Sequence, residues 1–127
     1  MPIEIQAYES KKLTICIASG ELTFEDVSNA IESFYESTPT LNVLWDLSST
    51  TTTNVTTGQV HQISELLERL RKSRKGGKTA LVSPADITYG LSRMLQMLLD
   101  LTGDPLPVEL RVFRDRKEAM QWFSEDR

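Results

Sequence analysis

The sequence contains a single cysteine, Cys16, and a single histidine, His61, and this scarcity excludes several kinds of site. One cysteine cannot form an internal disulfide, so we expect a reducing compartment. A zinc site needs several ligands close together, and Cys16 belongs to a predicted strand far along the chain from His61. We therefore expect neither a metal nor a cofactor, and we interpret His61 as a surface or boundary residue of a predicted helix.

Long apolar runs are also missing. No stretch approaches the ~18 residues that a membrane-spanning helix needs. The first residues, MPIEIQAYESKK, lack the apolar stretch behind a basic start that marks a secretory leader. We therefore expect a cytoplasmic protein without stable membrane insertion.

Catalytic motifs are absent as well. The nucleophile elbow G-x-S-x-G does not occur in the sequence. Gly76-Gly77-Lys78 lies at the start of a predicted strand rather than after one, and the phosphate-loop pattern G-x-x-x-x-G-K-[ST] is missing. We expect no catalytic residues and no enzymatic activity. A hydrolase that uses Asp46 and nearby loop hydroxyls is the weakest of our hypotheses.

Charge is nearly balanced, because 14 basic and 18 acidic residues give a net charge of −4. A basic stripe at 69–78 is one that a nucleic acid or an anionic lipid would exploit. However, Glu65 and Glu68 are spaced to pair with basic residues one helical turn later, and no aromatic residues interleave for base stacking. We interpret the stripe as a solvated helix end and expect no nucleic-acid partner. Its members are Arg69, Arg71, Lys72, Arg74, Lys75 and Lys78.

The length and composition of the chain predict one folded domain. The 127 residues are 39% hydrophobic, and no repeat or linker interrupts them, so residues 1–127 are predicted to form a single domain. Hydrophobic periodicity predicts four helices and five strands. The strands are expected at 3–8, 12–18, 42–47, 78–83 and 108–113.

Capping residues mark where the four helices should begin. Thr23 and Thr56 are each followed three residues later by a capping-box partner, Asp26 and Gln59. Ser83 and Asp115 are the expected caps of the third and fourth helices. Gly76 and Gly77 are expected to end the second helix, and Gly103 the third, which the sequence interrupts near Gly90.

The predicted order is ββαβαβαβα, an α/β fold with a mixed, mostly parallel five-stranded sheet. The carboxyl ends of parallel strands gather at one edge, where ligands of open α/β sheets tend to bind. Glu21, Asp46 and Ser48 are the polar residues expected there. Asp46 has two open roles: it binds a ligand or metal, or it accepts hydrogen bonds from the loop that follows.

The segment ITYGLSRMLQMLLDL at 87–101 has more apolar positions than one helix face uses. Its predicted core stripe is Leu91, Met94, Leu95 and Leu98, and Leu99 falls outside it. Three explanations stay open: a homodimer contact, a groove for an apolar ligand, or a fuller core. The candidate partner or ligand surface consists of Tyr89, Arg93, Met94, Met97, Leu98 and Leu101.

Five motifs together resemble the bacterial SpoIIAA-like proteins of the STAS and CRAL-TRIO-like group. They are SGELT (19–23), VLWDLSS (43–49), GGKTALVSPAD (76–86), YGLSRM (89–94) and VFRDRKEAMQWF (112–123). The resemblance covers nearly the whole chain and implies a right-handed β-α superhelix. Relatives of this family include anti-sigma factor antagonists, transporter regulatory domains and lipid-transfer proteins, and many members have no assigned activity.

The resemblance also implies a candidate phosphorylation site. In the antagonists, Asp-Leu-Ser after a strand leads to Asp-Ser-Ser-Gly at the next helix, where a serine is phosphorylated. Here DLS at 46–48 matches the first part, but NVTTG at 54–58 departs from the second. Thr56 and Thr57 are the possible phosphoacceptors at a helix N-terminus that favours anions. The same hydroxyls are explained by helix capping, which we favour.

Two functional hypotheses follow. The first is a non-enzymatic regulatory or protein-interaction module that works as a homodimer. The alternative is a carrier or sensor of a small apolar or amphipathic, lipid-like ligand, held between the third helix and the sheet.

Overall fold

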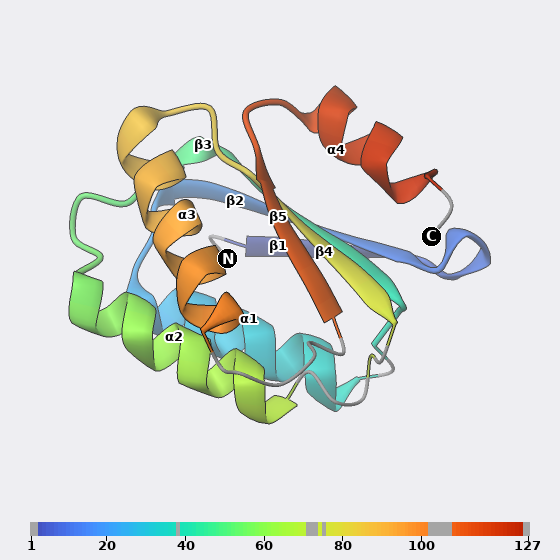
Figure 1. Cartoon of the computed structure of the whole chain (residues 1–127), viewed down its shortest axis with the longest axis horizontal. Helices are drawn as coiled ribbons and strands as arrows, with labels where there is room; N and C mark the ends of the chain where they lie inside the picture. Colours follow the sequence, from blue (N-terminus) through green and yellow to red (C-terminus); the bar gives the residue numbers. More distant parts are fainter. Residues whose placement is uncertain (1–2, 38, 71–73, 75, 102–107, 126–127) are drawn as a thin grey trace.

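The computed structural model describes residues 3–37, 39–70, 74, 76–101 and 108–125. Within them, strands and helices alternate in the predicted order (Figure 1). The elements are β1 (Ile3–Tyr8), the short 3-10 helix η1 (Glu9–Lys11), β2 (Leu13–Glu21), α1 (Phe24–Glu36), β3 (Asn42–Thr51), α2 (Thr57–Leu70), β4 (Gly77–Val82), α3 (Asp86–Asp100), β5 (Val108–Phe113) and α4 (Arg116–Phe123).

All five strands form one sheet, and their spatial order β1-β2-β3-β4-β5 is also their order along the chain. β1 pairs with β2 antiparallel, and the other three pairs are parallel. The α/β class and the mixed, mostly parallel sheet are therefore confirmed.

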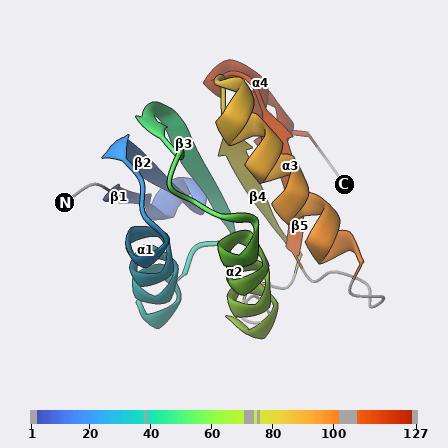
Figure 2. The ribbon, with the colours of Figure 1, turned by 90° about the vertical axis from the view of Figure 1, so that its left-hand side faces the viewer.

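Helices cover both faces of the sheet. α1, α2 and α3 lie on one face and α4 lies on the other (Figures 1 and 2). Successive strand residues point to opposite faces, so Val43 and Trp45 pack under the three helices while Leu44 packs toward α4. Central strands are thus buried on both sides, which accounts for the mostly apolar residues at 42–47.

Three of the four predicted helix caps are confirmed. The Thr23 hydroxyl accepts from the amide of Asp26, whose carboxylate accepts from the Thr23 amide. Thr56 and Gln59 make the same reciprocal pair at the start of α2. Asp115 accepts from the amide of Glu118 at the start of α4. These caps use partners three residues apart, so the local sequence was sufficient to find them.

The prediction that Ser83 caps the third helix was wrong. Its amide donates to the carbonyl of Phe113, which extends the pairing of the sheet. Its hydroxyl is buried and lies 2.9 Å from the hydroxyl of Ser92 in α3. α3 begins at Asp86 and runs through Gly90 without a break. The expected stop at Gly103 lies outside the described residues.

The structure describes the second helix as far as Leu70, and residues 71–73, which precede the predicted end at Gly76 and Gly77, lie outside the described residues. Gly77 instead opens β4, where an added Cβ would lie 2.1 Å from the carbonyl oxygen of Leu41. Glycine is required here because the backbone of the neighbouring chain segment passes too close for any side chain.

The predicted strands at 12–18 and 42–47 were too short, and much of the serine and threonine run after Asp46 belongs to β3. β2 continues to Glu21 and β3 to Thr51, and the register pairs Gly20 with Thr50. Threonine is β-branched and favours extended backbone, and the Thr50 hydroxyl donates to the Gly20 carbonyl at 2.7 Å. The run therefore extends a β2–β3 ribbon before it turns toward α2.

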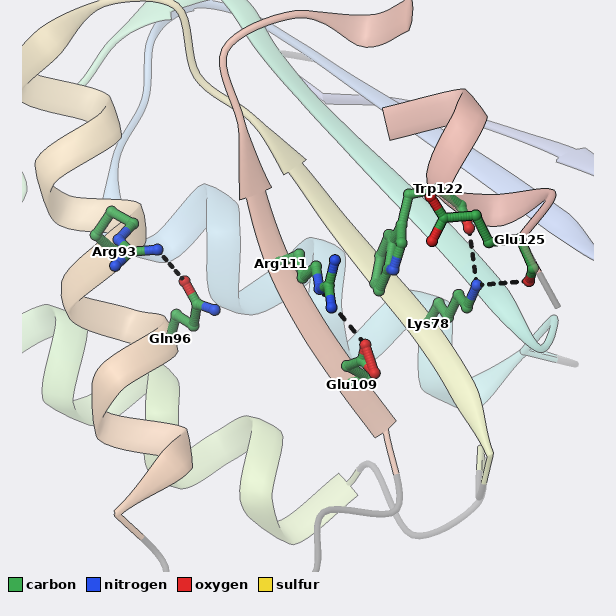
Figure 3. Close-up of polar contacts among 7 residues, drawn as sticks. All are labelled: Lys78, Arg93, Gln96, Glu109, Arg111, Trp122 and Glu125. Carbon is green, nitrogen blue, oxygen red and sulfur yellow. Dashed lines mark hydrogen bonds and ion pairs between the residues drawn. The ribbon is translucent and has the colours of Figure 1, made fainter. Parts of the chain in front are cut away.

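Two members of the predicted basic stripe are buried rather than solvated. Arg74 is 3% exposed and Lys78 is 5% exposed. The Lys78 ammonium donates to the carbonyl oxygens of Trp122 at 2.7 Å and Glu125 at 3.1 Å, at the end of α4 (Figure 3). A cation at a helix C-terminus satisfies carbonyls that have no partner within the helix, so Lys78 fixes α4 to the sheet.

Replacing Lys78 by methionine keeps the aliphatic stem but removes the donors for these two carbonyls. We expect Lys78→Met to lower the free energy of unfolding by about 1–3 kcal/mol, because buried acceptors lose their partner. Chemical denaturation measures the change. Lys117→Met, at an exposed position of α4, is the matched control and should leave stability nearly unchanged. Equal stability of the two variants would contradict the role assigned to Lys78.

Candidate functional site

An apolar cavity of about 110 Å³ lies between helices α1 to α3 and the sheet face they cover. It exists because all three helices direct their apolar faces at the same side of the sheet. We call it the core cavity. Its wall includes Ile31 and Phe34 of α1, Ile63 and Leu67 of α2, Leu91, Leu95 and Leu99 of α3, and Val43, Trp45, Leu81 and Leu110 of the sheet.

A few hydroxyl groups line the cavity near the carboxyl ends of the strands, and they pair with each other. The Oγ1 atoms of Thr52 and Thr88 are 3.0 Å apart. Ser92 also lines the cavity and pairs with Ser83, as described above. Both pairs join the first half of α3 to the segments that follow β3 and β4. Because these hydroxyls satisfy each other, this end of the cavity demands no polar ligand.

The opposite end of the cavity holds the buried guanidinium of Arg74. It lies 5.3 Å from the ring centre of Phe34 and 5.8 Å from that of Tyr35. Among the described residues, no carboxylate forms an ion pair with it. Its five donors meet five neutral oxygens: the carbonyls of Thr40 (3.0 Å), Leu41 (2.9 Å) and Lys78 (3.0 Å), and the hydroxyls of Tyr35 (3.0 Å) and Thr79 (2.9 Å).

Comparison with known proteins identifies the fold. Neither a family model nor a curated protein matches the chain. A protein of the DUF3478 family with a SpoIIAA-like fold, from Shewanella loihica, is 19% identical over 95% of this chain and 91% of its own, with a TM-score of 0.58. An anti-sigma factor antagonist from Mycobacterium paratuberculosis is 15% identical over 97% and 93% of the two chains, with a TM-score of 0.59.

The chain has the SpoIIAA-like fold. The phosphorylated form of the Bacillus cell fate determinant SpoIIAA also matches, at 14% identity over 94% of this chain and 97% of its own, with a TM-score of 0.51. The resemblance seen in the sequence is thus confirmed as a likeness of fold. Identities this low do not carry an activity from one protein to another.

The polar residues predicted at the carboxyl ends of the strands form hydrogen bonds and an ion pair with other residues of the protein. Asp46 accepts from the Ser48 amide at 3.0 Å and lies 3.6 Å from the guanidinium of Arg116. Glu21 accepts from the side-chain amide of Asn54. Of the two roles left open for Asp46, the structure contains a hydrogen bond from a following amide, but the donor Ser48 belongs to β3 rather than to a loop. As a ligand-binding edge, Glu21, Asp46 and Ser48 stay a prediction.

The candidate phosphoacceptors are exposed at the start of α2. The Thr56 hydroxyl accepts from the Gln59 amide at 3.1 Å, which is the capping role that we favoured. Thr57 is the first residue of α2. Phosphorylation of either residue stays a prediction.

α3 divides its apolar residues between the cavity and the outside. Leu91, Leu95 and Leu99 line the core cavity. The prediction that Leu99 lies outside the core stripe was wrong, because this side chain is 2% exposed. The buried face of α3 includes the polar residues Thr88 and Ser92 as well as leucines. The spacing of apolar residues alone could therefore not locate this face.

The outer side of α3 carries an apolar surface that we call the α3 ridge, made of Ile87, Met97 and Leu101. Their side chains are 62%, 59% and 78% exposed. Met94 and Leu98 are half-buried beside the ridge.

The two polar residues of the predicted partner surface make local contacts. Arg93 donates to Gln96 on α3 at 3.1 Å (Figure 3). Tyr89 lies under the guanidinium of Arg114, 3.8 Å from the ring centre. The six residues predicted as a partner or ligand surface thus lie beside the cavity wall, and their role stays a prediction.

Other kinds of site have no counterpart in the described part of the chain. There, no three His, Cys, Asp or Glu side chains gather to hold a metal ion. No described helix is both long and apolar enough to cross a membrane.

Burial raises the pKa of the Cys16 thiol to about 12, although the charge of Arg74 acts in the opposite direction. The thiol is thus held in its protonated, unreactive form.

Cys16 should therefore resist alkylation in the folded protein. At about pH 8, we expect iodoacetamide to label it only after denaturation, as measured by intact-protein mass spectrometry. Because the folded pKa is raised from 9.0 to about 12, this group stabilises the fold fully below pH 9 and loses its contribution as pH rises toward 12. Labelling of the native protein at the rate of a free thiol would contradict the assigned burial.

Proposed function

We propose that the protein acts by binding rather than by catalysis, as a carrier or sensor of a small apolar or amphipathic ligand. The core cavity is the observation that supports this function best. An unfilled cavity costs about 24 cal/mol per Å³, so a cavity of about 110 Å³ corresponds to about 2–3 kcal/mol. A ligand that fills the space recovers part of this free energy.

The size and wall of the cavity restrict the ligand. An engineered cavity of roughly 150 Å³ with a similar Leu, Ile and Phe wall binds benzene. The core cavity is slightly smaller, at about 110 Å³. It is therefore suited to a compact group or a chain of about four to six carbons, and it is too small to enclose a long acyl chain.

The two tryptophans offer a direct test, because Trp45 lines the cavity and Trp122 packs on the opposite face of the sheet. In Trp122→Phe, only Trp45 fluoresces. We expect titration with benzene or hexan-1-ol to change this fluorescence saturably and to raise the melting temperature, since a ligand bound only by the folded state stabilises it.

Trp45→Phe is the matched control, in which fluorescence from Trp122 should stay constant. A titration without saturation, together with an unchanged melting temperature, would remove the support for a ligand-binding function.

The α3 ridge favours a second function, a non-enzymatic regulatory module that contacts another protein, with a second copy of this chain as the first candidate. Ile87, Met97 and Leu101 leave apolar area in water that a protein contact would bury. The fold supports this proposal only by analogy, since one matching structure is named an anti-sigma factor antagonist.

Charge placed on the ridge should break such a contact. We expect the wild-type protein to sediment as a dimer at about 10 µM, within the range where a modest interface is occupied. The double variant Met97→Glu/Leu101→Glu should sediment as a monomer with unchanged circular dichroism. Met120→Glu, at an exposed position of α4, is the control and should remain dimeric. A monomeric wild type across the concentration range would reject the homodimer.

A further inference from the structure

Arg74 is a buried cation that the described part of the protein does not neutralise. Its guanidinium is 3% exposed, and every oxygen that it contacts is neutral. Buried charges are normally paired with an opposite charge, because taking a charge out of water is costly. Carbonyl and hydroxyl dipoles satisfy its hydrogen-bonding capacity but leave the net charge in place.

This charge lies at one end of the core cavity. Arg74 lines the cavity together with two of its partners, Tyr35 and Thr79, at the amino ends of the central strands. At the other end, the hydroxyls of Thr52, Thr88 and Ser92 are neutral and are paired. Leucine, isoleucine, valine and aromatic side chains fill the wall between these ends. The cavity is therefore apolar along its length and positive at one end.

We propose that the core cavity binds a short-chain carboxylate, with its anionic head at Arg74 and its hydrocarbon tail among the leucines of α3. This inference rests on the ligand-binding function proposed above and specifies the ligand further. A carboxylate supplies the negative charge that Arg74 lacks. A neutral hydrocarbon fills the same volume but leaves the cation unpaired.

Tyr35 is the group that gives way to the carboxylate. Its ring is only half-buried, and it also borders a surface groove between α1 and α2 that includes Glu32 and Leu66. When the phenol turns toward this groove, one guanidinium N–H that donated to its hydroxyl donates to the carboxylate instead. A hydrogen bond between two charged groups is stronger than one to a neutral hydroxyl. The carbonyl contacts of Arg74 stay in place.

Thr79 supplies the second contact. Its hydroxyl oxygen accepts from Arg74, which leaves the hydroxyl proton free to be donated to the other carboxylate oxygen. The head group is then held by two donors with fixed positions, one from β4 and one from Arg74.

The test compares two ligands of nearly identical shape and different charge, hexanoate and hexanamide. Binding to the Trp122→Phe protein is followed at neutral pH by Trp45 fluorescence and by calorimetry. We expect hexanoate to bind about 10-fold more tightly or better, because a charge-assisted contact replaces a neutral one. Equal binding of the two ligands, or tighter binding of hexanamide, would overturn the assignment of Arg74.

This comparison also separates the inference from the function on which it rests. Hexanamide binding as tightly as hexanoate leaves the cavity function intact and removes the anionic head site. Saturable binding of neither ligand removes both. The comparison of the two ligands in the Trp122→Phe protein needs no change at Arg74, whose contacts hold the strand ends together.

Two conservative variants sharpen the result. Tyr35→Phe removes the competing hydroxyl, so the affinity for hexanoate should rise several-fold while that for hexanamide changes little. Thr88→Val, at the opposite end of the cavity, is the matched control and should leave the preference for the carboxylate unchanged. An unchanged hexanoate affinity in Tyr35→Phe would contradict the displacement of the phenol.

Discussion

The rest of the structure depends on how one buried cation is satisfied. Arg74 donates to backbone carbonyls of Thr40, Leu41 and Lys78, and so joins the segment before β3 to the start of β4. Through the Tyr35 hydroxyl it also joins α1 to the sheet. Each acceptor helps to hold the guanidinium in place, because a donor left unpaired inside a protein is costly. The same contacts that order the strand ends also place a positive charge in the cavity.

Among the residues that the structure describes, polar contacts from α3 to other segments lie in its first half, and this bears on how the cavity wall is held. Its first half is held by hydroxyl pairs through Thr88 and Ser92, and Arg114 binds Asp86 at 2.7 Å. In its second half, Leu95 and Leu99 hold the helix by apolar contact. Hydrogen bonds fix direction and register, whereas apolar contacts tolerate small shifts. The second half of α3 is therefore the part of the cavity wall best able to adjust to a ligand.

The fold was predictable from the sequence where the decisive contacts are local. Capping at Thr23, Thr56 and Asp115 and the alternation of strands with helices gave the elements and their order. Contacts between distant segments could not be foreseen. Ser83 meets Ser92 only once α3 lies against the sheet, and Lys78 meets the carbonyl of Trp122 44 positions away.

The cavity was predictable only as one of several explanations for an overly apolar helix. A cavity exists where the side chains do not fill the space between the helices and the sheet. The amino-acid sequence does not give this space, because it depends on how the elements pack in three dimensions. That helix serves both proposed functions, since Leu91, Leu95 and Leu99 face the cavity while Ile87, Met97 and Leu101 face outward. A ligand that fits without moving α3 leaves the ridge where it is. A ligand that moved α3 would move the ridge with it, because the two sets of side chains share one backbone. Ligand size therefore decides whether the two functions are independent or linked.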